Sequence, residues 1–393
     1  MPNVHGRELS RGELTRRLSR LDAVAGVRLV TLGDGAERGV RVLEFRTGTG
    51  LDFDVIVDRC MDVGAVRYRG AAIGWQSPTG FRSPWLHDPE GERGLGFLRS
   101  FTGFMNTCGL DHAFFMETVP ADGYAYPARE AVDQPLHGRS AFTPARLAGY
   151  GSRWEGDECI LWAEGEVIQA AMFGEDLHLV RRIEARVGAS GFTVEDRVEN
   201  HGFARTPHML LYHVNLGWPL LDEGSEFRAP VERLMWRSHE AYRNGVGYRT
   251  MPPPQPTEFV EQVYTHAVAT EADGTVPAAL VNRRLDLGGG DGGPGLAFLI
   301  EYDRAELPVL LEWQCVRDGG YVLGIEPSTA HPGGAALNEE HGLLRWLEHG
   351  ESRRYRTRFS VVAGASAVAA LEDRIDALHP QLAGEFPDPS GIG

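Results

Sequence analysis

Runs of alternating apolar and polar residues recur along this chain of 393 residues, and they constrain its fold more than any other feature. Alternation with a period of two places successive side chains on opposite faces of a β-strand. The runs are short, polar turns separate them, and no rhythm of strand, helix and strand is visible. The sequence therefore predicts an all-β fold of antiparallel sheets. The clearest runs are 27–32, 39–47, 51–58, 158–168, 177–187, 191–200, 295–302, 308–316, 321–326 and 355–362.

Helical periodicity occurs only near the two ends. In residues 8–22, Leu14, Leu18 and Leu21 share one stripe with arginines opposite, which predicts a short leading helix. A second helix is expected from about residue 366 to near Pro380, with a loose tail after it. We therefore expect a helical arm at 1–25, one β-domain at 26–365, and a C-terminal helix and tail at 366–393.

Two stretches of unusual composition interrupt the strands. Residues 251–257 (MPPPQPT) are rich in proline, and residues 288–295 (GGGDGGPG) are rich in glycine. Strand patterns continue on both sides of each, so we interpret them as surface loops within one domain. The glycine-rich stretch lacks the lysine and the following helix of a phosphate-binding loop.

The charge and cysteine content narrow the partners. The net charge of −16 disfavours binding to nucleic acid, because such a surface repels phosphates. No run of about 18 apolar residues predicts a membrane span, and the N-terminus lacks the apolar core of a signal peptide. The four cysteines form no CxxC pair, so we expect buried thiols in a soluble, cytoplasmic protein.

The stretch HMLLYHVNLG, residues 208–217, carries polar side chains where a strand normally carries core residues. In a strand, Met209, Leu211, His213 and Asn215 share one face, which becomes polar toward its C-terminal end. A face of this kind is typical of a strand that runs out of the core into a cleft. The alternative for His213 is a core histidine bonded to a neighbouring carbonyl.

The stretch YVLGIEPS, residues 321–328, has a carboxylate in a strand interior. Gly324 and Glu326 share a face, and the missing side chain at Gly324 allows close approach of a ligand or another backbone. Burying Glu326 is costly unless it is paired or hydrated. The alternative is an ion pair at a strand end.

Two further stretches carry polar side chains that could serve a site. His137 lies in the short connection QPLHGRS, and Arg99, Asn106 and His112 lie among apolar residues in 97–113. An arginine in such a run needs an anionic or hydrogen-bonding partner. Taken alone, a loop histidine such as His137 is usually a surface residue.

Metal and serine-hydrolase chemistry have little support. The histidines show no HExxH or HxH spacing, and there is no GxSxG elbow. We therefore expect no metal site and no cofactor.

Taken in order, Arg99, LHG with His137, YHVNLG with His213, and GIEP with Glu326 form a recognisable set. This set resembles the aldose 1-epimerase (galactose mutarotase) superfamily. The run HVNLGWPLLDEG is similar to that of a bacterial branch of uncharacterised members. The resemblance extends from about residue 25 to about residue 363, and VDRCMDVG and NTCGL share it.

The resemblance implies a fold and an activity. The fold would be a β-supersandwich of large antiparallel sheets with a sugar in a cleft on one of them. Glu326 would take the proton from the anomeric hydroxyl and His213 would give a proton to the ring oxygen. His137 and Arg99 would hold the sugar. Histidine, with a pKa near neutrality, and a ready carboxylate suit these two roles.

The residues that grip the sugar are less clearly marked. Asp222, Asn215, Trp313 and Gln314 are candidates, for hydroxyl binding and for stacking on the sugar ring. We expect His213, Glu326 and His137 to converge within about 10 Å, the span of a pyranose and its hydrogen bonds. The expected partner is a small, neutral sugar.

Two other functions remain open. One is a carbohydrate-binding protein without catalysis. The other is a different isomerase, lyase or glycosidase that acts on a modified sugar. A second carboxylate facing Glu326 would favour glycoside cleavage, because that reaction uses two carboxyl groups.

Overall fold

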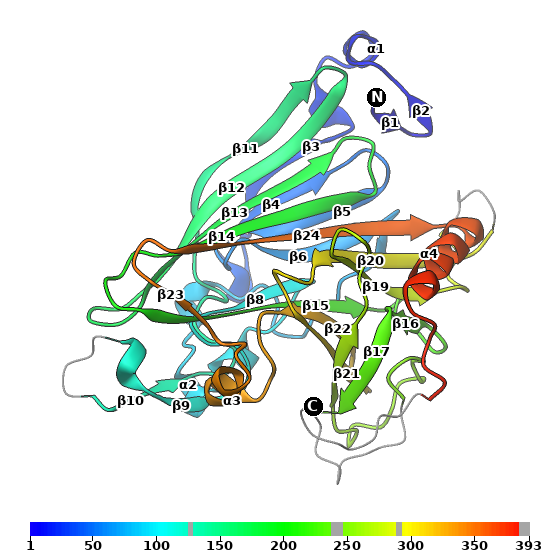
Figure 1. The fold of residues 1–393 in the computed structure, drawn as a ribbon. Helices are drawn as coiled ribbons and strands as arrows, with labels where there is room; N and C mark the ends of the chain where they lie inside the picture. Colours follow the sequence, from blue (N-terminus) through cyan, green and yellow to red (C-terminus); the bar gives the residue numbers. More distant parts are fainter. Residues whose placement is uncertain (125–128, 237–246, 288–292, 385–393) are drawn as a thin grey trace.

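The computed structural model describes residues 1–124, 129–236, 247–287 and 293–384. Two large antiparallel sheets and a smaller one make up most of the molecule, as the alternation predicted (Figure 1). The first large sheet has eight strands, in the order β11 (Arg146–Glu155), β12 (Glu158–Ala170), β13 (Asp176–Arg186), β14 (Gly191–Asn200), β24 (Ser352–Ala363), β20 (Leu296–Asp303), β19 (Thr275–Asn282) and β16 (Glu226–Arg228).

The second large sheet carries the candidate site. Its order is β17 (Val231–Trp236), β18 (Gln262–Val268), β21 (Val309–Arg317), β22 (Gly320–Ser328), β15 (Thr206–Gly217) and β23 (Arg345–Leu347), and β8 (Met105–Leu110) also pairs with β15. A five-stranded sheet follows the chain order β3 (Gly26–Thr31), β4 (Arg41–Arg46), β5 (Leu51–Ile56), β6 (Asp62–Tyr68) and β7 (Ala71–Ala72). Two small hairpins pair β1 (Asn3–Val4) with β2 (Arg7–Glu8), and β9 (Glu117–Pro120) with β10 (Ala131–Gln134).

Helices are few and short. They are α1 (Arg11–Thr15), α2 (Gly91–Gly94), α3 (Gly334–Glu340) and α4 (Ala365–Leu378), with short 3-10 turns η1 (Leu21–Ala23), η2 (Gly35–Glu37), η3 (Pro84–Leu86), η4 (Gly96–Arg99) and η5 (Ala121–Gly123). No helix in the described part of the chain is both long and apolar enough to cross a membrane.

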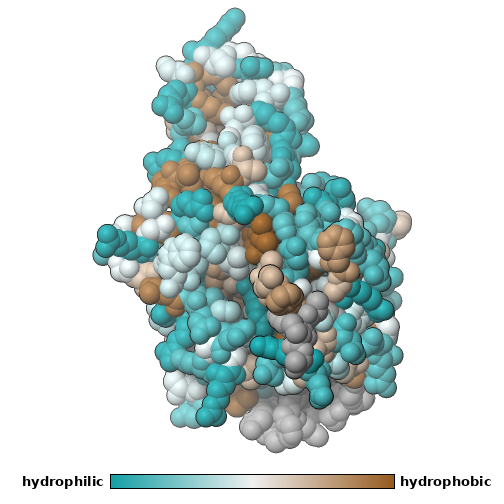
Figure 2. Space-filling model, turned by 90° about the vertical axis from the view of Figure 1, so that its left-hand side faces the viewer, coloured by the Kyte–Doolittle hydropathy of each residue, from teal (hydrophilic) through white to brown (hydrophobic). Residues whose placement is uncertain are grey.

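The leading helix is shorter than the 8–22 segment predicted. Ser10 and Glu13 form a capping box that starts α1, but the helix ends at Thr15. Of the predicted stripe, Leu14 is buried, whereas Leu18 and Leu21 pack only partly against the core. A helix of this length is marginal in water without an apolar face to bury, so the second half does not form. In Figure 2 this end of the molecule is a narrow projection above a broader body.

The C-terminal helix is confirmed. Helix α4 buries Val368, Leu371 and Ile375 against β19 and β20, and it ends two residues before Pro380. The proline-rich stretch 251–257 is an irregular segment that reaches β21 through the backbone of Gln255 and Val316. Part of the glycine-rich stretch, 288–292, and the end of the tail, 385–393, lie outside the described residues.

The core between the sheets is apolar and aromatic. Phe53 of the five-stranded sheet stacks on Phe192 of the eight-stranded sheet, with ring centroids 4.3 Å apart. Phe192 stacks in turn on Phe359, at 5.0 Å. Phe104, just before β8, completes the contact with the rings of Phe298 and Phe359. The strands that carry the site are therefore anchored on a rigid interior.

A buried ion network fixes β8 and β15 from behind. Arg181, fully buried, donates to Asp62 at 2.7 Å and to Asp196 at 2.6 Å. The Tyr212 hydroxyl donates to Asp196 at 2.6 Å, and the Thr107 hydroxyl donates to Asp62 at 2.6 Å. Because side chains alternate along a strand, the residues next to Tyr212 and Thr107 face the opposite side of the sheet.

Candidate active site

The register of two strands places His213 opposite Glu326. On β15, Leu211 pairs with Ser328 and Val214 with Ile325 of β22, so His213 and Glu326 face each other between them. His213 Nε2 lies 3.2 Å from Glu326 Oε1. The pair does not have the geometry of a hydrogen bond, so Oε1 lacks a hydrogen-bond partner among the described residues. Both side chains are nearly buried, at 6% and 5% exposed.

Gly324 leaves room for the carboxylate of Glu326. A Cβ at position 324 would lie 2.4 Å from Glu326 Oε1 and 3.2 Å from Trp313 Cβ. The close approach expected at this glycine is therefore made by the carboxylate two residues along the same strand. A side chain at 324 would push that carboxylate away from His213.

His137 approaches the pair from a loop. Its ring centroid lies 5.5 Å from that of His213, and its Nδ1 is buried without a hydrogen-bond partner in the described part of the chain. Its backbone N–H donates to Phe114, and its carbonyl accepts from Gly109 of β8. Gly138 follows with φ +74°, and a Cβ there would lie 2.3 Å from the Gly109 carbonyl oxygen. The LHG motif is thus a turn packed tightly on β8, and glycine is the residue that fits it.

Aromatic rings enclose the pair. Phe101 and Trp313 meet the His213 ring edge-on, with centroids 4.8 Å and 5.2 Å away. Phe97 packs on His137 at 4.7 Å. Aromatic rings therefore pack around three polar side chains, His213, Glu326 and His137.

Burial sets the protonation of the pair. Loss of hydration lowers the pKa of His213 to about 3, and it lowers the pKa of His137 well below its ordinary value. Burial first, and the nearby charge of Glu261 second, raise the pKa of Glu326 to about 8. At neutral pH the pair therefore holds one proton, on Glu326. This corrects the expectation of a histidine with a pKa near neutrality beside a ready carboxylate.

Trp313 packs beside His213, and it hydrogen-bonds a residue that the sequence did not suggest. Its indole Nε1 donates to Glu261 Oε2 at 2.7 Å, just before β18. Glu261 is exposed, and its charge acts on Glu326. No motif marked Glu261, since it precedes its strand in an ordinary acidic segment.

Asn215 lies on the same face as His213, but its side-chain amide hydrogen-bonds backbone carbonyls. Its amide donates to the Gly103 carbonyl at 3.0 Å and to the His213 carbonyl at 3.1 Å. Asn106, opposite His213 on β8, similarly donates to the Thr102 carbonyl at 3.2 Å. The two amides hold the segment around residues 102–103, which follows Phe101.

Three predicted residues are not brought to the pair. Arg99 lies in η4 between Phe97 and Phe101, but its side chain is 65% exposed and pairs with Glu92. Gln314 points to the opposite face of β21 from Trp313, where it donates to the carbonyls of Gly247 and Tyr248. Asp222 lies in the turn after β15, where its carboxylate caps the next backbone N–H.

The described residues include no group of three or more His, Cys, Asp or Glu side chains placed to hold a metal ion. The pair itself offers a carboxyl group and an imidazole within 3.2 Å of each other. Such a pair can accept one proton from a small ligand and donate another proton to the same ligand.

Comparisons with known proteins agree with this fold. The profile of a family described as domain of unknown function 4432 matches residues 37–361. No curated protein matches the chain. A candidate aldose 1-epimerase from Klebsiella pneumoniae subsp. pneumoniae is similar in structure, with a TM-score of 0.80 and 25% identity over 93% of this chain and 91% of that one.

More distant structures share the architecture. Galactose 1-epimerase from Lactobacillus acidophilus has a TM-score of 0.51 and 12% identity, over 86% of this chain and 99% of that one. A galactose mutarotase-like protein from Clostridium acetobutylicum has a TM-score of 0.50 and 13% identity, over 86% and 98%. These two likenesses bear on the fold alone. Together, the three confirm the β-supersandwich that the motifs led us to expect.

Proposed function

The chain belongs to the family described as domain of unknown function 4432, and from that premise we propose that it is an isomerase that interconverts the anomers of a sugar. The observation that carries the proposal is the His213–Glu326 pair, 3.2 Å apart and nearly buried among aromatic rings. The similarity to a candidate aldose 1-epimerase supports the same reaction class.

The spacing of the pair suits the chemistry of an anomeric carbon. Ring opening removes a proton from the anomeric hydroxyl and delivers one to the ring oxygen. Both oxygens are bonded to the same carbon, so two groups about 3 Å apart can each reach one of them. Holding both groups on neighbouring strands fixes that spacing without motion of the backbone.

The catalytic cycle needs only the single proton that the pair holds at neutral pH. When the proton moves from Glu326 to His213, the carboxylate can accept the proton of the anomeric hydroxyl. His213 then gives its proton to the ring oxygen as the bond to the anomeric carbon breaks. The chain form rotates about its C1–C2 bond, and the reverse transfers close the ring on the other face of the carbonyl. The enzyme ends with its proton back on Glu326, the resting arrangement.

The side chains next to the pair suggest how a sugar is held. The Trp313 ring offers an apolar face, and Glu261 beside it offers a carboxylate for hydroxyl groups. We assign the gripping role to Glu261 in place of Asp222. Among the described residues no cation acts on the pair, so the proposed sugar is neutral. The buried Nδ1 of His137 offers a further hydrogen bond to a hydroxyl group.

Glycoside cleavage is the second candidate, because Glu261 is a carboxylate close enough to raise the pKa of Glu326. The experiment that separates the candidates is a survey of neutral aldoses and aryl glycosides. Anomer exchange, followed by NMR, is expected to accelerate for at least one aldose, without release of the aryl group. Acceleration of neither reaction by folded protein would reject the proposal, and aryl release alone would favour cleavage.

A further inference from the structure

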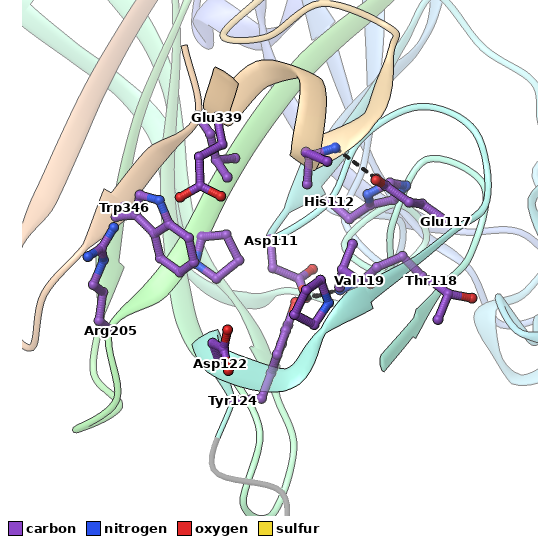
Figure 3. Close-up of a pocket in the computed structure, with 16 residues that line it drawn as sticks. Asp111, His112, Glu117, Thr118, Val119, Asp122, Tyr124, Arg205, Glu339 and Trp346 are labelled. Carbon is purple, nitrogen blue, oxygen red and sulfur yellow. Dashed lines mark hydrogen bonds between the residues drawn. The ribbon is translucent and has the colours of Figure 1, made fainter. Parts of the chain in front are cut away.

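A second cavity, of about 340 Å³, lies apart from the histidine–glutamate pair (Figure 3). It is formed by β9, η5, α3, β23 and the start of β15, and neither His137, His213 nor Glu326 lines it. Its volume falls in the range of small-molecule sites. The function proposed above uses none of the residues that line it.

The floor of the cavity is a rigid polar network. Asp111 Oδ2 accepts from the Tyr124 hydroxyl at 2.7 Å and from Gln134 Nε2 at 3.0 Å. Asp111 Oδ1 accepts from Gln169 Nε2 at 2.6 Å. Asp111 and Gln134 are buried, so this end of the cavity is shaped before any ligand arrives.

The walls are acidic. Four carboxylate residues line the cavity, and Arg205 is the one arginine or lysine among its lining residues. Arg205 lies over the Trp346 ring, with its guanidinium carbon 4.1 Å from the centroid. Figure 3 shows Glu339 and Asp122 on opposite sides of the space beside Trp346. Unlike Asp111 and Glu117, these two exposed side chains are not engaged by backbone or side-chain donors in the described part of the chain.

A buried histidine forms part of the cavity wall. His112 lines it and is 1% exposed, yet its Nδ1 has no hydrogen-bond partner among the described residues. Its other nitrogen, Nε2, is 2.7 Å from the Phe115 carbonyl, so Nε2 carries the proton and Nδ1 is an acceptor. Because Nδ1 is buried away from the open space of the cavity, His112 shapes the wall and is not counted among the ligand contacts.

We propose that this cavity is a second binding site, which takes a small ligand that carries an ammonium group beside hydroxyl groups. Excess carboxylate favours the cation, and the exposed acceptors at Glu339 and Asp122 suit ammonium and hydroxyl donors. Trp346 and the apolar side chains Val119 and Leu344 cover the carbon skeleton. Phosphorylated and carboxylated ligands are disfavoured by the same charges.

Three polyols that differ at one end test the charge preference. Glucamine ends in an ammonium group, sorbitol in a hydroxyl group and gluconate in a carboxylate, and none of them has an anomeric centre. Calorimetry on the full chain should give glucamine a dissociation constant about tenfold below that of sorbitol, and no heat with gluconate. Equal affinity for all three, preference for gluconate, or no binding of glucamine would overturn the proposal.

Two neighbouring glutamates on α3 supply the matched variants. Glu339→Gln should reduce the affinity for glucamine to that for sorbitol, because it removes a lining charge. Glu340→Gln removes the same charge from an exposed side chain outside the lining and should leave binding unchanged. Glu326→Gln should also leave it unchanged, since the pair lies elsewhere. An equal loss with Glu340→Gln, or loss with Glu326→Gln, would show that the ligand is not held here.

Discussion

His213 and Glu326 are cross-strand neighbours whose side chains lie 3.2 Å apart, and burial lowers the pKa of the histidine and raises that of the glutamate. The same sheet has another such pair: His266 Nε2 lies 2.9 Å from Glu312 Oε2, fully buried on its other face. Chemically the two pairs are alike. The first lies beside Trp313, whose indole bonds the exposed Glu261, whereas the second packs among Phe227, Tyr248 and Tyr264 of the core. Position, not residue type, separates a site from a core contact.

The first prediction concerns the pH dependence of the rate. The active pair needs one proton, which Glu326 loses as pH rises through about 8. His213, with a pKa of about 3, gains a second proton only in strong acid. The value of kcat/KM for anomer exchange should therefore be flat through neutral pH and fall above about pH 8. A fall centred near pH 6.5, the ordinary pKa of histidine, would contradict this assignment.

Glu261 should change the pH at which the rate of anomer exchange begins to fall. Its negative charge is the second cause of the raised pKa of Glu326, after burial. The substitution Glu261→Gln removes that charge, so the pKa of Glu326 should fall and the loss of rate should begin at lower pH. KM for the sugar should also rise if Glu261 binds hydroxyl groups. Exposed Glu258, changed to Gln, is the control, and an unchanged profile in the Glu261 variant would exclude the coupling.

Gly324→Ala tests the space reserved for the carboxylate. The new Cβ would lie 2.4 Å from Glu326 Oε1, so the carboxylate must move off His213. A displacement of about 1 Å at a reacting group can lower kcat by roughly 10²-fold. On the same strand, a Cβ at Gly320 meets only the flexible side chain of Arg317, at 3.4 Å, and Cys315 farther away. Gly320→Ala should therefore keep its rate, and equal rates in the two variants would refute the steric argument.

The sequence predicted the sheets and the C-terminal helix because alternation and helical stripes are local signals. It also predicted the faces of His213 and Glu326, since strand parity follows from spacing. Trp313 and Gln314 were both predicted to bind the sugar. They are adjacent on β21 and point to opposite faces, so only one of them could lie at the pair. Gln314 is the one that points away from the pair.

Other parts of the site depend on tertiary structure. Arg99 lies in a 3-10 turn, and nothing local indicated that its phenylalanine neighbours would face the pair while it faced solvent. Asp222 is near His213 in sequence but lies beyond the end of the strand. Glu261 approaches through the β18–β21 pairing, a long-range contact without a motif. Burial, which lowers the pKa of His213 and raises that of Glu326, is likewise a property of the folded chain.

The most direct test compares anomer exchange in wild type, Glu326→Gln and Glu312→Gln, with circular dichroism to verify folding. Both substitutions remove a carboxyl group from a buried pair with histidine on the same sheet. The account predicts that Glu326→Gln lowers the rate by at least about 10²-fold, the contribution of one positioned acid–base group, while folded Glu312→Gln stays within a few-fold of wild type. Full activity in Glu326→Gln would contradict the central claim, and so would an equal loss in folded Glu312→Gln.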